Sequence, residues 1–407
     1  MLLPAEHFAA ALVFLLLGSG GLVWVAPDLA NGSFSVSRVV AVTHLFTLGW
    51  ITTTIMGALY QFLPVALQVP VRSERVALAT FAVYAPGLTL FVGGMAAGHH
   101  PSVMAGAVLF GSGLILFVGN LAATLCRAPD RNLTWWALVG AAASLLVTVL
   151  LGVALSGNLG WGYLGAHRLL ALGVHIHVAV AGWVMLVVVG VAHRLLPMFL
   201  LSHGAPEWPG RAAAGLIGSG VLALVTLHHL LTPLLLWPIA LLIASGFVAF
   251  LAQAAFYFRH RKKPALDPGM RLAAVALGFI ALALVLAPFF LTSGAAAPRV
   301  ATAYVTALVL GGFSLFVAGH YYKIVPFLVW FHRFGPLVGK QAVPKVADLY
   351  DPRIGNAAVA LLGVGALGLV LATLTGTVVA ARPAAALFAA GAALVAIQML
   401  TISRRRP

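Results

Sequence analysis

Histidine is the residue type in this chain that most clearly offers chemistry. The chain has 407 residues, of which 14 are histidine, 62% are hydrophobic and only 8% are charged. Ionisable groups inside apolar segments are costly and usually functional. Imidazole is a good ligand for copper and for haem iron. The eight acidic residues fall at the ends of apolar segments or between them, so we expect histidines rather than carboxylates to carry the chemistry.

Two stretches of similar sequence place histidines at equivalent positions. Residues 43–67 align with residues 176–200 at a constant offset of 133, which pairs His44 with His177. The same offset matches two Gly-Trp pairs, a glycine in each stretch and a Leu-Pro pair. A weaker third copy occupies residues 311–330, where Gly319 aligns with Gly190. Such internal similarity indicates a repeat. We predict a single membrane domain of three pseudo-repeats, 1–132, 133–265 and 266–407.

Histidine pairs add a second spacing. His99-His100 and His228-His229 are separated by nearly the offset of the repeat, and each pair lies near the end of an apolar segment. Three imidazoles at one depth would suit copper. The candidate metal ligands are His44, His177, His228, His229, His99 and His100. The alternative is that these side chains hydrogen-bond neighbouring helices or lie at the membrane interface.

His175 and His177 are expected to serve different sites. Two residues on a helix are separated by about 200° of rotation, so the two rings would face different cavities. Arg168 and Arg299 stand near outer helix ends, where they could meet anionic groups such as haem propionates. Snorkelling anchors are the equal alternative for both arginines. The candidate cofactor-binding residues are therefore His44, His175, His177, Arg168 and Arg299.

Long apolar helices must position these residues. Runs of roughly 20 apolar residues are long enough to cross a bilayer, and only helices or closed barrels can do so. No two-residue alternation typical of barrel strands is seen. The sequence predicts an all-α polytopic membrane protein in a lipid bilayer. The twelve expected spans are 6–26, 36–67, 76–98, 101–125, 134–156, 167–201, 211–232, 234–258, 271–292, 299–332, 355–379 and 383–402.

The basic residues predict an orientation. The net charge of +15 comes from arginines and lysines in short connections after even-numbered spans, which is the positive-inside pattern and argues against a nucleic-acid partner. Both termini are expected on the cytoplasmic side of a bacterial-type inner membrane. The apolar N-terminal run has no basic flank and is interpreted as a retained span. With the single cysteine Cys126, no internal disulfide can form.

The chain resembles subunit I of the haem–copper oxidase superfamily, which includes oxygen and nitric oxide reductases. The resemblance rests on twelve spans in three groups of four, the segment THLFTLGW, and histidines in spans two, six and seven. It is also similar to twelve-helix haem–copper membrane proteins of nitric oxide stress. The resemblance implies haem b at His44, and copper at His175 or His177 with His228 and His229. It also implies a cytochrome c or quinol donor and a small accessory membrane subunit.

The sequence departs from this family in several places. Span ten has no His-x-His pair, Ala181 stands where the oxidases have a tyrosine, and no span carries the glutamates of nitric oxide reductases. The only His-x-His is in span six. The ligand set could therefore be shifted by one pseudo-repeat relative to the family, so that span six takes the place of span ten. The expected function is a b-type haem redox protein, with copper as a second metal and an oxidoreductase activity toward oxygen or nitric oxide. The alternative is a histidine-based copper or proton-coupled transporter without haem.

Overall fold

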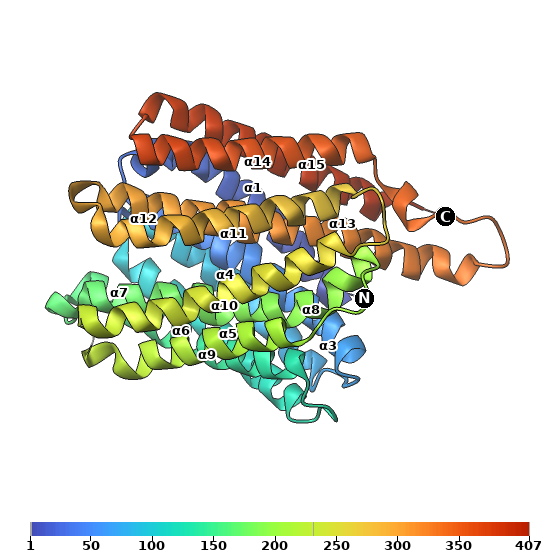
Figure 1. Ribbon diagram of the computed structural model, residues 1–407, viewed down its shortest axis with the longest axis horizontal. Helices are drawn as coiled ribbons and strands as arrows, with labels where there is room; N and C mark the ends of the chain where they lie inside the picture. The colour runs from blue at the N-terminus through green and yellow to red at the C-terminus, as the bar shows by residue number, and fades with distance from the viewer. Residues whose placement is uncertain (1, 231, 407) are drawn as a thin grey trace. The chain divides into compact units, whose positions relative to one another are not determined.

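The computed structural model describes residues 2–230 and 232–406, and helices account for nearly all of that chain (Figure 1). Within these residues there is no strand, and one isolated bridge joins Ser202 and Arg261. Among the described residues, twelve helical stretches are long and apolar enough to cross a membrane. The all-α, polytopic prediction is confirmed. Residue 231, inside the seventh expected span, lies outside the described residues.

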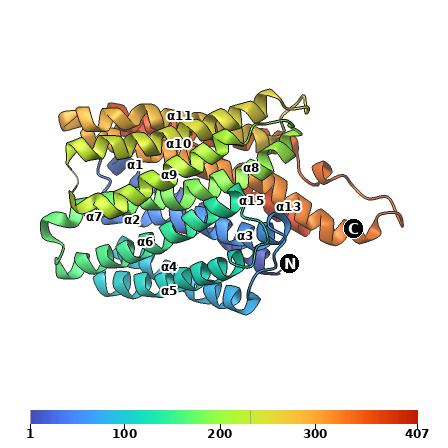
Figure 2. The ribbon, with the colours of Figure 1, turned by 60° about the horizontal axis from the view of Figure 1, so that its bottom comes forward.

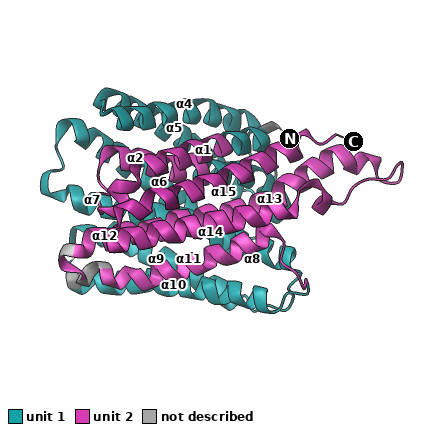
Figure 3. Ribbon diagram, turned by 90° about the horizontal axis from the view of Figure 1, so that it is seen from above, with its two compact units in different colours: residues 1–10, 52–262 teal, residues 11–51, 263–407 magenta. Residues whose placement is uncertain are grey.

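The chain forms two compact units, shown in teal and magenta in Figure 3. Unit 1 comprises Met1–Ala10 and Thr52–Lys262, and unit 2 comprises Ala11–Ile51 and Lys263–Pro407. The helix α1 (Leu2–Ala30) and the turn η1 (Leu45–Thr52) contribute to both. The remaining elements of unit 1 are α3 (Thr53–Ala66), α4 (Glu74–Ala97), α5 (His100–Leu125), α6 (Leu133–Trp161), η2 (Gly165–His167), α7 (Arg168–His177), η3 (Val178–Met185), α8 (Leu186–Leu200), α9 (Trp208–Leu227), η4 (His228–Leu230) and α10 (Pro233–Arg259).

The elements of unit 2 include the longest candidate span, Ala297–Leu337. They are α2 (Ser37–His44), α11 (Pro268–Thr292), η5 (Gly294–Ala296), α12 (Ala297–Thr306), η6 (Ala307–Ser314), α13 (Leu315–Val329), η7 (Trp330–Phe334), η8 (Gly335–Leu337), η9 (Val346–Leu349), α14 (Pro352–Thr375) and α15 (Val378–Arg404). The tenth span therefore continues beyond its expected end at residue 332. Its end and the following loop extend past α14 and α15 in Figure 1.

Small residues let neighbouring helices approach closely, as is common in membrane proteins. In unit 1, α4 and α5 lie side by side (Figure 2). There Gly106 rests directly on the backbone of Phe91, where a side chain would have no room. In unit 2, α14 and α15 pair in the same way, with Gly391 against Leu362. Glycine packing therefore explains how such apolar helices associate without a polar core.

One amide contact recurs three times near the predicted inner end of the spans. Asn120 in α5 bonds both backbone groups of Ser73, which caps α4. Gln253 in α10 accepts a hydrogen bond from the backbone N–H of Gly210 at the start of α9 (3.2 Å). Gln398 in α15 donates to the carbonyl of Asp351, which caps α14 (2.7 Å). Each contact ties the last span of an expected four-span group to the start of the span before it.

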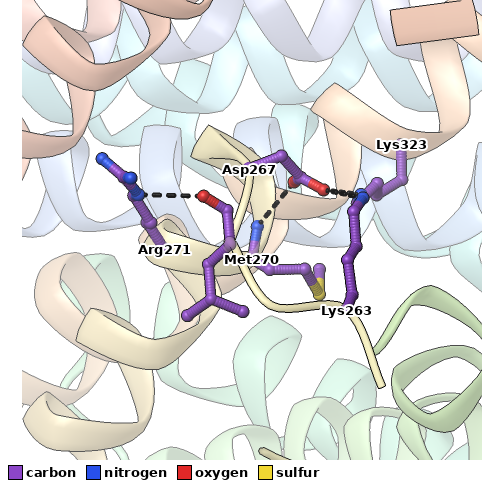
Figure 4. Close-up of polar contacts among 6 residues, drawn as sticks. Lys263, Asp267, Met270, Arg271 and Lys323 are labelled. Atoms are coloured by element: carbon purple, nitrogen blue, oxygen red, sulfur yellow. Dashed lines mark hydrogen bonds and ion pairs between the residues drawn. The ribbon is translucent and has the colours of Figure 1, made fainter. Parts of the chain in front are cut away.

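A buried ion-pair cluster closes the predicted inner end of unit 2. Asp267 caps α11 by accepting from the backbone N–H of Met270 (3.1 Å). Its other carboxylate oxygen accepts from Lys263 (2.9 Å) and from Lys323, as Figure 4 shows. The side chains of Asp267 and Lys323 are only 13% and 12% exposed. The cluster fixes the loop before α11 against α13.

Candidate haem and metal ligands

Three π-helical turns interrupt the helices that carry the repeated motif. They are η1, η3 and η6, each eight residues long. The turns start at Leu45, Val178 and Ala307, so their spacing reproduces the offsets of the sequence repeat. π-helical turns are rare and are frequent at functional sites. The sequence motif therefore corresponds to a shared and unusual backbone feature.

The residue immediately before each π-helical turn is His44, His177 or Thr306. His44 and His177 are both candidate ligands from the sequence, and they share a local geometry as well as an alignment. Thr306 takes the equivalent place in the third copy, and it is buried. Two of the three turns thus begin directly after an imidazole.

Local hydrogen bonds orient both imidazoles. The Nδ1 of His44 lies 2.8 Å from the carbonyl oxygen of Val40, and the Nδ1 of His177 lies 2.8 Å from that of Gly173. A carbonyl oxygen only accepts, so Nδ1 donates in each pair and Nε2 carries the lone pair. Metal-binding histidines are usually held in this way by a hydrogen bond at the other ring nitrogen. In this tautomer, Nε2 is the nitrogen of each ring that could bind a metal.

His175 contacts a different helix from its neighbour His177. Its Nδ1 lies 3.1 Å from the carbonyl oxygen of Thr148 on α6. Gly152, one turn further along α6, lies against the ring, where an added Cβ would stand 3.2 Å from Cε1. His175 is half-buried while His177 is exposed. The expectation that the two rings face different surroundings is consistent with these contacts.

Two tryptophans of the repeated motif hydrogen-bond to the π-helical turns. In unit 1, the indole of Trp183 donates to the hydroxyl of Thr52 (3.0 Å). In unit 2, the indole of Trp50 donates to the carbonyl of Ser314 (3.4 Å). Trp50 and Trp183 are equivalent positions, and so are Thr52 and Ser314, which are the last residues of η1 and η6. The Gly-Trp pairs therefore hold the turns in place as well as filling space.

The two His-His pairs lie in exposed turns. His99 is the N-cap of α5, its Nδ1 lies 2.8 Å from the Ser102 hydroxyl, and His100 begins α5 rather than ending the third span. The rings of His228 and His229 stand edge to face at 5.6 Å. Among residues 2–230 and 232–406, no three His, Cys, Asp or Glu side chains gather as a preformed metal site. These four histidines belong to no such cluster.

Arg168 and Arg299 are both exposed helix-end residues. Arg168 starts α7. The guanidinium of Arg299 lies over Gly376, the C-cap of α14, where an added Cβ would stand 2.7 Å from Nη1. A cation near a helix C-terminus is favourable, so the end of α14 accounts for the position of the Arg299 guanidinium.

Two ionisable residues that are wholly or largely shielded from solvent were not among the sequence candidates. His7 in α1 has no exposed surface, and Lys323 pairs with Asp267 inside the longest span. The sequence did show that both residues are ionisable and lie in apolar runs, which is a signal of function. It did not show how far each side chain is shielded from solvent, because His7 is close to the N-terminus and Lys323 is close to the following loop.

Comparison with known proteins adds no family to this picture. No protein-family model and no curated protein sequence matches the chain, so its function is argued from its own residues.

Proposed function

We propose that this chain is an integral membrane redox protein that binds b-type haem, with His44 in unit 2 and His177 or His175 in unit 1 each as a candidate ligand in its own unit. The observation that carries the proposal is the shared geometry of His44 and His177. Each donates Nδ1–H to a carbonyl four residues earlier, directly before a π-helical turn. Bound haem would supply an iron that takes up and releases one electron.

The side chains suit haem better than copper. A haem iron needs one or two imidazole Nε2 ligands, and the Nδ1 hydrogen bonds leave Nε2 as the lone-pair nitrogen of each ring. The three-imidazole copper set expected from the sequence finds no preformed cluster within the described residues. We therefore assign no step to copper, and the protein's part is to hold the imidazoles in one tautomer and one orientation.

The organisation of the chain in three pseudo-repeats is part of the same proposal. The spacing of η1, η3 and η6 and the three amide contacts support three pseudo-repeats of four spans around a pseudo-threefold axis. The family resemblance, and with it reduction of oxygen or nitric oxide using a cytochrome c or quinol donor, is proposed on this basis.

A reduced-minus-oxidised visible spectrum of the purified protein tests the proposal. Iron and copper are quantified in the same sample, and carbon monoxide or nitric oxide reveals an open coordination position. His44→Ala is expected to lose most of the haem. His260→Ala is the matched control, since His260 makes the same bond to a carbonyl four residues earlier but is exposed near the predicted inner end. A colourless, iron-free protein from haem-replete cells would overturn the proposal.

The ion pair between Lys323 of the longest span and Asp267 favours the second candidate, a proton-coupled or copper transporter without haem. Lys323 belongs to the longest span and pairs with Asp267, the residue before α11. Transporters place ionisable residues of this kind along their proton or ion pathways. In proteoliposomes made from iron-free protein, proton or copper flux that disappears in Lys323→Met would support it. Absence of flux in the unmodified protein would remove it.

A further inference from the structure

His7 is buried in unit 1 in a setting that ordinary core packing does not explain. Its ring lies 4.7 Å from that of Phe81 and 5.5 Å from that of Tyr60. The Nδ1 lies 2.8 Å from the Leu3 carbonyl, so it donates and leaves Nε2 as an acceptor. Nε2 is buried and makes no hydrogen bond to any described atom. Such buried polar groups call for a specific explanation.

The residues around His7 share this shortage of partners. The hydroxyls of Tyr60 and Thr80 are buried and, within the described chain, have no partner of acceptable geometry. The side chains of Thr80 and Asn120 lie near the Tyr60 hydroxyl, but they make no hydrogen bond of standard geometry with it. All four residues are at least nine-tenths buried. A buried water typically makes about three hydrogen bonds, and the acceptor of His7 together with two hydroxyls supplies that number.

A polar route joins these residues to the surface. Asn120 holds both backbone groups of Ser73 at 2.9 and 3.0 Å. The hydroxyl of Thr124 donates to the Asn120 carbonyl and accepts from the backbone N–H of Arg72. Arg72 is exposed in the loop 67–73. Hydrogen-bonding groups therefore connect the loop 67–73 to Asn120, and the side chain of Asn120 lies near the Tyr60 hydroxyl.

At the equivalent position elsewhere in unit 1, a tyrosine hydroxyl supplies a hydrogen-bond partner. His193 and Gln253 align with Tyr60 and Asn120 at the offset of 133. There the hydroxyl of Tyr257 reaches the Nδ1 of His193 at 3.2 Å. The residue that aligns with Tyr257 is Thr124, which is much shorter. The hydroxyl that Tyr257 supplies to His193 therefore has no counterpart at Tyr60 within the described residues.

We propose that His7, Tyr60, Thr80 and Asn120 enclose a buried water cluster that connects the His7 imidazole to solvent at the loop 67–73. Through this cluster His7 exchanges its ring proton with the aqueous phase on that side of the membrane. The site takes water or hydronium, and it does not depend on the haem proposed above. His7 is positioned by Gly57, where an added Cβ would stand 2.6 Å from the His7 Cβ.

Water-edited nitrogen NMR on the full chain in lipid bilayers, with ¹⁵N-labelled histidine, tests this proposal. The His7→Phe variant assigns the His7 signals. In the unmodified protein, the His7 imidazole is expected to receive magnetisation from water and to exchange its N–H proton. Thr80→Val removes one hydrogen bond to the water cluster and should lower this transfer about fivefold. Thr89→Val is the matched control on the same helix, since Thr89 is exposed and bonds its own helix backbone.

Two results would overturn the proposal. One is a His7 signal that receives no magnetisation from water while the exposed histidines do. The other is equal transfer in Thr80→Val and Thr89→Val. If Thr80→Val does not fold, Tyr60→Phe removes a second partner of the same water cluster and is expected to give the same decrease. The experiment reads water at His7 whether or not iron is bound, so its failure is distinct from failure of the haem proposal.

Discussion

Neutralising Asp267 is expected to destabilise unit 2 strongly. The carboxylate accepts from Lys263 and Lys323, and the Lys323 side chain is only 12% exposed. Removing one partner of a buried ion pair costs about 3–5 kcal/mol because the other charge stays buried. For Asp267→Asn we expect about 3 kcal/mol, since the retained side-chain oxygen can still cap α11. Asp267→Ala should cost about 1 kcal/mol more through loss of the cap.

A double variant separates the charge effect from packing. In Asp267→Asn combined with Lys323→Met, both charges are gone, and stability should return to within about 1 kcal/mol of the unmodified protein. Stability is measured as the midpoint of denaturant unfolding in detergent, followed by far-UV circular dichroism. An Asp267→Asn midpoint equal to that of the unmodified protein, or a double variant no more stable than the single one, would refute the reasoning.

The same cluster predicts a pH dependence. Burial acts to raise the pKa of Asp267, but hydrogen bonds from Lys323, Lys263 and the Met270 N–H, with the lysine charge, outweigh it and hold the pKa below its usual value. A carboxyl whose pKa is lower in the folded state stabilises that state above its unfolded pKa of about 3.9. This contribution is lost as the pH falls through the lower folded pKa. The difference in free energy of unfolding between Asp267→Asn and the unmodified protein should therefore stay constant above about pH 4 and decrease only below it.

The remaining predictions concern packing and hydrogen bonds. Gly57→Ala should destabilise the protein by about 1–3 kcal/mol, because its Cβ would stand 2.6 Å from that of His7. Gly93→Ala, with open space around it, should change stability by less than about 1 kcal/mol. The unfolding midpoints of the two variants are compared. Trp183→Phe should cost about 1 kcal/mol through the lost bond to Thr52, and Thr52→Val in the Trp183→Phe background should then add little. Gln398→Leu should speed amide exchange at the start of α14, because Gln398 bonds the cap residue Asp351, while exchange in α4 stays unchanged.

The fold class was accessible from sequence because a bilayer allows few solutions. Twelve apolar runs could only be helices, and the part of the chain that the structure describes contains twelve helical stretches of spanning length. Their limits were less predictable. His100 opens α5 instead of closing the third span, because Pro101 fits the first turn of a helix. The tenth span continues to Leu337, since apolar and aromatic residues extend it until Gly335-Pro336.

The internal repeat established which positions are equivalent, but it could not show what is unusual about them. The alignment of His44 with His177 required only the offset of 133. The π-helical turns that follow these residues depend on which carbonyl each backbone N–H bonds, and the repeated motif marked their positions without predicting their geometry. Tertiary structure likewise decided that His7 is buried and Lys323 half-buried, while His99 and His228 are exposed. Burial depends on which helices pack together, and only the folded chain brings Tyr60, Thr80 and Phe81 around His7.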